Sequence, residues 1–324
     1  LDRIVAQHPE IGSRSRARAA LESGKVRLDG AIVGYHDAGR PVLDPALVTI
    51  EMSRPGTSAE HVKARRSMVE NGVKILFEDD DLLAIDKPAG LLTDSATAQQ
   101  RRERQTARAA LEQYLRGKGS HAFVVHRIDR DTSGVVLFAK NAEAEERLKK
   151  QFEDHRPERV YWTAVQGGPD LDEGSWSDWM RWDAGKRIQE TCAPAAEGGV
   201  LAQANYRVLR RFKGATILEV RLVTGRRNQI RLQAALAGYP VIGERLYDRE
   251  PQKRRAVTLE RQALHALRLT VVHPTTRAPK TFTAPLPPDL TDLERRLRSG
   301  SSKPEESLHE PIRPARRPSP PRRS

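Results

Sequence analysis

The sequence predicts an α+β protein with about two domains. Segments with helical and strand patterns follow one another without the regular alternation that a doubly wound parallel sheet requires. The length of 324 residues exceeds that of one ordinary domain. A polar, aperiodic stretch at residues 52–68, MSRPGTSAEHVKARRSM, separates a short first unit from a long second one. We therefore expect a small domain at residues 1–51, a linker at 52–75, a main domain at 76–290 and a basic tail at 291–324.

The tail is expected to be disordered. The hydrophobic pattern fades after about Leu290, and the last fourteen residues, PIRPARRPSPPRRS, hold five arginines, five prolines and no acidic residue. Such a segment has too little apolar surface to offset the conformational entropy lost on folding.

The first unit is predicted to contain a helix followed by a short strand pair. Ser13 is suited to cap the helix and Gly24 to end it. An Asp29-Gly30 turn then interrupts a strand pattern. The apolar positions that first repeat at helical spacing and then alternate are Ala17, Ala20, Leu21, Val26, Leu28 and Ile32.

Basic side chains crowd this first unit. They are Arg14, Arg16, Arg18, Lys25 and Arg27. A solvated basic face is one interpretation. RNA binding is the other, because GSRSRARAALESGKVRLDGAIV resembles part of the S-four-like RNA-binding domain, and the match covers about fifty residues of this chain. The sequence departs from that family at Asp29, where asparagine is usual.

The main unit contains several strand patterns. They cover Leu82–Ile85, Val135–Ala139 and the segments ERVYWTAVQGG and ATILEVRLVTG. Turns are expected at residues 87–90 and 132–134. The segment from Asp170 to Gly199 shows little periodicity, and no element is predicted there.

Three helices are expected in the same unit. Thr106 is suited to cap the first, which Gly117 ends. Asn141 begins the second, and RRNQIRLQAALAG forms the third, which Gly238 ends.

The stretch HRIDRDTSGVVLFAK places one carboxylate, Asp129, between Arg127 and Arg130, just before a buried strand. A salt-bridged turn residue is the simplest interpretation, because structural ion pairs outnumber catalytic ones. The two guanidinium groups are expected to keep Asp129 ionised by lowering its pKa. An ionised carboxylate is suited to a reaction that builds positive charge at an anomeric carbon.

Five stretches in a fixed order change that interpretation. They are IDKPAGLLT, HRIDRDTSGVVLFAK, VYWTAVQG, LVTGRRNQIRLQAALAGYPVIGERLY and LHALRLTVVHP. Together they resemble the RluA-type family of pseudouridine synthases, over about residues 76 to 287. The resemblance implies a catalytic domain with a mixed, largely antiparallel sheet and flanking helices, which isomerises uridine in RNA to pseudouridine. Several members of that family also carry an S-four-like domain in front.

The resemblance implies three catalytic residues. Asp129 matches the catalytic carboxylate, and Arg231 matches the arginine that pairs with it. Tyr161 matches the active-site tyrosine, which can stack on the uracil and assist proton removal at carbon five. The structural alternatives are a half-buried strand tyrosine for Tyr161 and a surface phosphate contact for Arg231.

Three further arginines are candidates for RNA binding. Arg127 matches the residue that fills the space left when the target uridine leaves its stack. Its alternative is a plain ionic partner of Asp129. Arg130 and Arg226 are candidates for binding the RNA backbone.

The fourth stretch departs from the family pattern. Threonine-histidine is usual where this chain has Arg227-Asn228, and histidine is common where it has Gln233. These substitutions leave Asp129 and Arg231 in place, so they bear on the RNA target more than on the reaction.

Composition narrows the partners. Lys+Arg 56 against Asp+Glu 43 gives a net charge of +13 and a pI near 10.1, which favours a polyanion such as nucleic acid. No apolar run approaches the roughly 18 residues of a membrane span, and no signal segment is found. We expect a cytoplasmic monomer without a membrane partner, whose substrate is RNA, most simply large-subunit ribosomal RNA.

No metal and no cofactor are expected. Cys192 is the only cysteine, and the nine histidines show no paired spacing suited to a metal. The isomerisation is redox-neutral and uses no external nucleotide.

Other functions stay open from the sequence alone. One is a ribosome-assembly factor with an inactive synthase domain, which Arg227-Asn228 favours and the intact catalytic residues disfavour. Another is a synthase that acts on transfer RNA. A glycoside hydrolase with Asp129 and Asp131 as its carboxylate pair is disfavoured by the basic charge.

Overall fold

The computed structural model describes residues 1–22, 25–33, 37, 41–42, 44–51, 72–95, 106–116, 119–248 and 257–300. The predicted helix ends at Gly24 and Gly117, most of the predicted linker and the chain after Gly300 lie outside these residues.

The first unit follows the predicted order of helix and strands. Helices α1 (Asp2–Val5) and α2 (Arg14–Glu22) precede an antiparallel sheet with the order β2 (Ala31–Ile32), β1 (Val26–Leu28), β3 (Val48–Ile50). A short 3-10 helix, η2 (Pro45–Leu47), leads into β3.

Local chemistry explains the ends of these elements. The Ser13 hydroxyl accepts a hydrogen bond from the Arg16 amide (3.2 Å), which confirms the predicted cap. Asp29 (φ 52°) and Gly30 (φ 73°) connect β1 to β2 with two left-handed residues, as a tight hairpin turn requires. Ala17, Leu21 and Val26 are buried in the core of this unit, as their spacing predicts.

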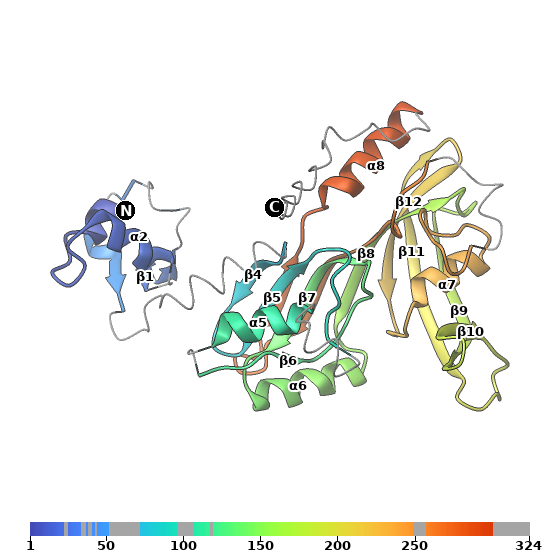
Figure 1. Ribbon diagram of the computed structural model, residues 1–324, viewed down its shortest axis with the longest axis horizontal. Coiled ribbons are helices and arrows are strands. Elements are labelled where there is room, and N and C mark those ends of the chain that lie inside the picture. Colours follow the sequence, from blue (N-terminus) through green and yellow to red (C-terminus); the bar gives the residue numbers. More distant parts are fainter. Residues whose placement is uncertain are drawn as a thin grey trace, which may run out of the picture.

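One large sheet dominates the rest of the described chain (Figure 1). Its main path has the order β10-β9-β11-β12-β8-β13-β7-β5-β4, with β14 paired to β13 and β6 to β7. The strands are β4 (Lys74–Glu78), β5 (Leu82–Lys87), β6 (Phe123–Val124), β7 (Ser133–Ala139), β8 (Glu158–Gln166), β9 (Glu173–Asp183), β10 (Ile188–Thr191), β11 (Val200–Phe212), β12 (Ala215–Leu222), β13 (Leu264–Val272) and β14 (Pro279–Thr283). Among the described strand pairs only β7 and β13 run parallel, so the predicted α+β class with a mixed, largely antiparallel sheet is confirmed.

The expected helices flank this sheet. They are α5 (Ala107–Leu115), α6 (Ala142–Glu153) and α7 (Gln229–Leu236). The hydroxyl of Thr106 accepts a hydrogen bond from the Ala109 amide (3.1 Å). The side-chain oxygen of Asn141 accepts one from the Ala144 amide (2.8 Å), so both predicted caps are confirmed.

Strand β7 is buried on both faces, which explains its continuous apolar sequence. Val136 and Phe138 pack in a cluster with Leu111 of α5. Val135 and Leu137, on the opposite face, pack in a cluster that includes Ala144 and Leu148 of α6. The strand that follows Asp129 is therefore fixed from both sides.

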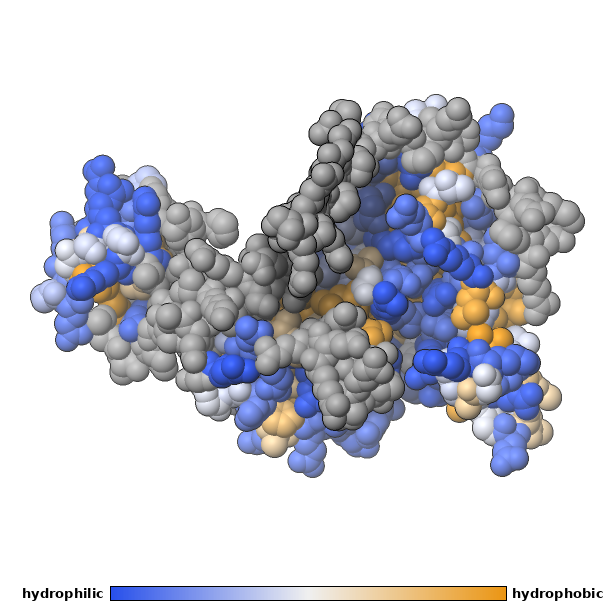
Figure 2. Space-filling model, viewed as in Figure 1, coloured by the Kyte–Doolittle hydropathy of each residue, from blue (hydrophilic) through white to orange (hydrophobic). Residues whose placement is uncertain are grey.

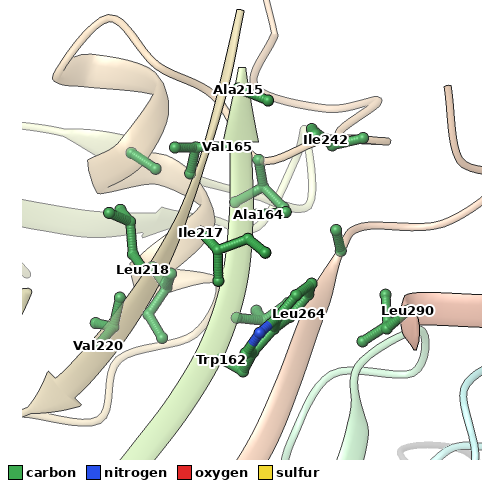
Figure 3. Packing of buried hydrophobic residues seen from close by; sticks show 14 of the residues in the cluster. Trp162, Ala164, Val165, Ala215, Ile217, Leu218, Val220, Ile242, Leu264 and Leu290 are labelled. Atoms are coloured by element: carbon green, nitrogen blue, oxygen red, sulfur yellow. The ribbon is translucent and has the colours of Figure 1, made fainter. Parts of the chain in front are cut away.

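The main domain extends beyond both predicted boundaries. Strand β4 begins at Lys74, inside the predicted linker, and helix α8 (Pro288–Ser299) runs past the predicted end at residue 290. Figure 3 shows Leu290 on the side of Trp162 and Leu264. Leu293 and Leu297 follow at helical spacing and join the same core, so the start of the predicted tail is a packed helix.

One other prediction is wrong, and one segment without a predicted element contains strands. Ser133 and Gly134 belong to β7 and not to a turn, because their backbones pair with β13. The segment 170–199, for which no element is predicted, contains β9 and β10. Only Trp176 and Met180 of β9 are buried hydrophobic residues, so the strand carries too few apolar positions to show a period of two.

Candidate active site

Asp129 lies in the loop that leads into β7, beside the parallel pair of β7 and β13. Gly134 permits the close approach of β7 to β13. It has a φ of +114°, and a Cβ there would lie 2.3 Å from the Ala266 carbonyl oxygen. Next to it, the Ser133 hydroxyl donates to Nδ1 of His265 (2.8 Å), whose Nε2 donates to the Ala284 carbonyl (3.2 Å). Burial lowers the pKa of His265 to about 4, so a neutral imidazole joins the strands.

The first sequence stretch, IDKPAGLLT, holds this loop in place. Thr93 clamps the residue before Asp129, since its hydroxyl bonds to both the carbonyl (3.1 Å) and the amide (3.3 Å) of Ile128. Lys87 fixes the residue after it. The fully buried Lys87 ammonium donates to the carbonyls of Arg130 (2.9 Å), Pro88 (2.8 Å) and Leu91 (2.7 Å).

His126 fixes the other end of the loop. Its Nε2 accepts from the Leu137 amide (2.9 Å), and its ring stacks on Phe152 with a centroid separation of 4.6 Å. Burial lowers the pKa of His126 to about 3, so the ring is neutral and free to accept this bond. The histidine of HRID is therefore a structural acceptor.

Arg231 and Asp129 come together as predicted. Nη1 of Arg231, on α7, lies 3.6 Å from Oδ2 of Asp129. The same guanidinium makes a bidentate pair with Glu244, with Nε–Oε2 and Nη2–Oε1 distances of 2.6 and 2.8 Å. Arg231 is thus held rigidly by one buried carboxylate and presented to another, which keeps 27% of its side-chain surface accessible.

The predicted electrostatics of Asp129 are wrong in sign. Burial raises the pKa of Asp129 and outweighs the opposing effects of Arg231 and the weaker one of Arg127. Arg130 contributes little because its side chain is exposed and its Nε donates to the Gly90 carbonyl (3.1 Å). The main counter-charge comes from Arg231, about a hundred positions away in the chain, and the adjacent Arg127 adds only a weaker one.

Asn228 completes the support of Arg231. It is the N-cap of α7 in a left-handed conformation (φ 52°), which asparagine tolerates well. Its Oδ1 accepts from Nη1 of Arg231 (3.1 Å), and its Nδ2 donates to the Tyr247 hydroxyl (3.0 Å). The residue that replaces the family's usual histidine therefore orients the arginine that contacts Asp129.

Tyr161 lies on β8, in register with Ala266 of β13 and Val220 of β12. It packs at the edge of the two main apolar clusters. Burial raises the pKa of Tyr161 to about 12. Arg159 lowers this pKa and Asp129 raises it further, so the phenol is protonated at neutral pH.

The candidate RNA-binding residues are spread over the molecule. Arg127 is exposed beside Asp129. Arg226 is half-buried, and its Nε donates to the Leu201 carbonyl (3.1 Å), so part of its guanidinium serves the fold. Arg14 and Arg18 in the first unit both bond to the buried carboxylate of Asp2 and stay about half exposed.

Sequence reasoning missed three charged residues of the site, one of which is Lys87, the donor to the Arg130 carbonyl. Glu244 carries no signal of its own in VIGERLY, although it is the bidentate partner of Arg231. Arg159, two residues before Tyr161, is buried; its Nη2 donates to the Val223 carbonyl (3.0 Å) while its Nε has no hydrogen-bond partner. An arginine inside a predicted strand, two residues before a tyrosine, is the one signal that could have been noticed.

The described surface fits a polar partner. Figure 2 shows hydrophilic residues over most of the visible face, with small apolar patches between them. Among the described helices none is long and apolar enough to cross a membrane. The described residues also contain no group of three or more histidine, cysteine, aspartate or glutamate side chains arranged for a metal ion.

Comparisons with known proteins agree with this geometry. A family model described as RNA pseudouridylate synthase matches residues 81–236. The chain is 31% identical to the ribosomal large subunit pseudouridine synthase D of Zymomonas mobilis over 309 residues, which are 92% of this chain and 93% of that protein. It is 34% identical to the protein of the same name from Nitrosomonas europaea over 303 residues, which cover 92% and 84% of the two chains.

A solved structure supports the fold. The human RNA pseudouridylate synthase domain containing 4 superimposes with a TM-score of 0.57 at 19% identity, over 74% of this chain and 97% of that one.

Proposed function

Because this chain belongs to the RluA-type family of RNA pseudouridine synthases, and is thus an isomerase acting on RNA, we propose that it modifies uridine in large-subunit ribosomal RNA with Asp129 as the catalytic carboxylate. One observation carries the residue assignment. The Asp129 carboxylate is accessible on one side and lies 3.6 Å from an arginine that Glu244 holds in place.

The chemistry requires a carboxylate of this kind. Cleavage of the glycosidic bond builds positive charge at the anomeric carbon, which an adjacent carboxylate stabilises or traps. The uracil then turns, and a carbon–carbon bond forms between the anomeric carbon and carbon five of the base. Carbon five then loses its proton and the ring nitrogen freed from the ribose takes one up, so the product contains the same atoms as the substrate.

The burial of Asp129 contributes to this step. A partly desolvated carboxylate is a better partner for a developing cation than a hydrated one, because the surrounding medium screens the attraction less. Arg231 favours the ionised form of the group, while the raised pKa of Asp129 reflects that desolvation. Clamping by Thr93 and Lys87 on either side holds the carboxylate in position.

We propose that Tyr161 contacts the target uracil and that Arg127 contacts the RNA stack from which the uridine is extruded. The neutral phenol of Tyr161 can stack on the extruded uracil, whereas a pKa of about 12 disfavours the phenolate that would accept a proton. Arg127, exposed next to Asp129, is suited to occupy the space left by the uridine.

The choice of ribosomal RNA rests on the relatives. The two proteins named ribosomal large subunit pseudouridine synthase D align over 92% of this chain. Transfer RNA is the alternative substrate, and an inactive assembly factor is the alternative function.

Mapping of pseudouridines tests the proposal. Large-subunit ribosomal RNA from a deletion strain should lack at least one pseudouridine that its parent contains. Wild-type protein should restore it, and Asp129→Asn should not. Loss of a transfer RNA pseudouridine alone would transfer the activity to that substrate. Restoration by Asp129→Asn would remove Asp129 from the reaction.

A further inference from the structure

An exposed tryptophan contacts Arg227, the residue that precedes Asn228 of this site. Trp182, on β9, keeps 38% of its surface accessible, and the guanidinium carbon of Arg227 lies 3.9 Å from its ring centroid. Of the four tryptophans in the chain, Trp162 and Trp176 are buried in the core. Trp182 therefore exposes apolar surface that neither the sheet nor α7 covers.

Direct contacts connect this pair to the catalytic arginine. Trp182 pairs with Gln189 of β10, and the backbone amide of Gln189 donates to the Tyr247 hydroxyl (3.0 Å). The same hydroxyl accepts from Asn228 (3.0 Å), which holds Arg231. Arg227 immediately precedes Asn228 in the chain.

The charge around the pair is positive. Arg187 and Arg227 are exposed in this region, in the hairpin turn and before α7, whereas Arg181 alternates with Trp182 along β9 and faces the other side of the sheet. The two acidic groups of the hairpin, Asp183 and Glu190, share Lys186 (3.4 and 2.6 Å), and Arg187 balances the remaining negative charge, so the exposed Arg227 leaves the region positive. Single-stranded nucleic acid binds to surfaces of this kind, because its bases stack on aromatic rings and its phosphates are attracted to positive charge.

We propose that Trp182 and Arg227 form a stacking platform that binds an unpaired nucleotide of the RNA beside the target uridine. The base stacks on the exposed indole, and the guanidinium supplies positive charge to the adjacent phosphate. The platform involves one of the two residues at which the chain departs from the threonine-histidine of its family, so it is a feature that selects the RNA rather than one that performs the reaction. The proposal rests on the proposed function only in taking RNA as the ligand.

A binding measurement separates base stacking from charge. The two probes are a short single-stranded oligouridylate and an abasic ribose-phosphate strand of the same length and charge. Trp182→Ala should weaken binding of the oligouridylate roughly tenfold, the size expected when a base loses its aromatic partner, and leave the abasic strand unaffected. Trp182→Phe keeps a ring and should retain most of the affinity, which also guards against a folding defect in the alanine variant.

Matched variants complete the experiment. Leu209→Ala removes another exposed apolar side chain (43% accessible), on β11, and should bind both strands as wild type does. Arg227→Gln should weaken both strands and lower the salt slope by about 0.7, the value for one lost phosphate contact on a single strand. If Trp182→Ala bound both strands like Leu209→Ala, the platform would be overturned.

Turnover on ribosomal RNA gives an independent test. Trp182→Ala should raise the RNA concentration at half-maximal rate and leave kcat near the wild-type value. A loss of kcat with unchanged half-saturation would assign Trp182 to the structure around α7 and overturn the proposal. If the wild type itself formed no pseudouridine in ribosomal RNA, the proposed substrate would fail while the oligouridylate comparison would still decide on the platform.

Discussion

The arginine at the centre of the site is shared between two carboxylates, and this sharing determines what its loss would do. Arg231 is mostly buried, with 13% of its side chain accessible, and Glu244 is fully buried. Removing the guanidinium would leave two carboxylates close together without a counter-charge. Breaking a buried pair in this way costs about 3–5 kcal/mol.

We predict that Arg231→Ala is inactive, with a single-turnover rate reduced about 10²-fold or more at saturating RNA. Arg231→Lys should recover only part of the rate, because lysine cannot make the bidentate pair with Glu244. A simple phosphate contact would behave differently, since lysine would substitute well and high RNA concentrations would hide the defect. Near-normal rates for Arg231→Ala would place this residue on the binding surface.

The pH dependence of the rate reports on Asp129. Its carboxyl has a pKa raised by burial, so it takes up a proton at a higher pH than an ordinary aspartate of 3.8. The reaction needs the ionised form, so the single-turnover rate should fall as the pH is lowered through this raised pKa. An acid limb at or below the ordinary value for aspartate would contradict the desolvated site.

The same shift makes a prediction about stability. A raised pKa in the folded state means that the ionised carboxylate destabilises the fold relative to the unfolded chain, and this cost is present at neutral pH. Asp129→Asn, which is expected to be inactive, should therefore unfold at a temperature no lower than the wild type at pH 7. The advantage should shrink as the solution is acidified and Asp129 itself becomes neutral.

At the scale of single elements, the sequence predicts those whose signal is local. Caps at Ser13, Thr106 and Asn141 depend on one side chain and its nearest amides, and the structure confirms them. Strand β9 lacks such a signal because only two of its eleven residues, Trp176 and Met180, are buried. The pairing of Ser133 and Gly134 with β13 was equally hidden, since its partner strand lies about 130 residues later.

That pairing can be tested at one glycine. Gly134→Ala would place a methyl group 2.3 Å from the Ala266 carbonyl oxygen, at a φ that alanine rarely adopts. We expect it to lower the free energy of unfolding by about 3 kcal/mol or more, as a clash added to backbone strain. Gly90→Ala is the matched control, because Gly90 also has a positive φ (+83°) but nothing lies within 4 Å of its Cβ position. Equal losses in the two variants, measured by denaturant titration, would show that strain alone matters.

At the scale of the whole molecule, charge was the most informative property of the sequence. The balance of +13 indicated an RNA partner, and family membership agrees. Composition could not tell which arginines are available. Arg14 and Arg18 share the buried carboxylate of Asp2, whose pKa they lower despite its burial, so part of the basic surface of the first unit stabilises that unit.

Deletion of residues 1–51 tests how much the basic side chains of the first unit contribute to RNA binding. Each phosphate contact that is lost should lower the slope of log affinity against log salt by about 0.7–0.9. We expect weaker binding of structured ribosomal RNA and a flatter slope, with turnover of a small excised substrate largely preserved. An unchanged slope would mean that the basic residues of this segment form only a solvated face.

The order of the strands also has a consequence for how the protein is made. Strands β7 and β8 follow each other in the chain but lie on opposite sides of β13, which is synthesised about a hundred residues later. Until β13 emerges from the ribosome, β7 and β8 each have an edge without its final partner. Incorrect strand pairing at these two edges must be avoided during that time. Because β13 supplies His265 and the carbonyl against Gly134, the loop that carries Asp129 acquires its final shape only after β13 has been synthesised. Contacts so distant in sequence form slowly, so we expect refolding in vitro to be limited by the insertion of this late strand.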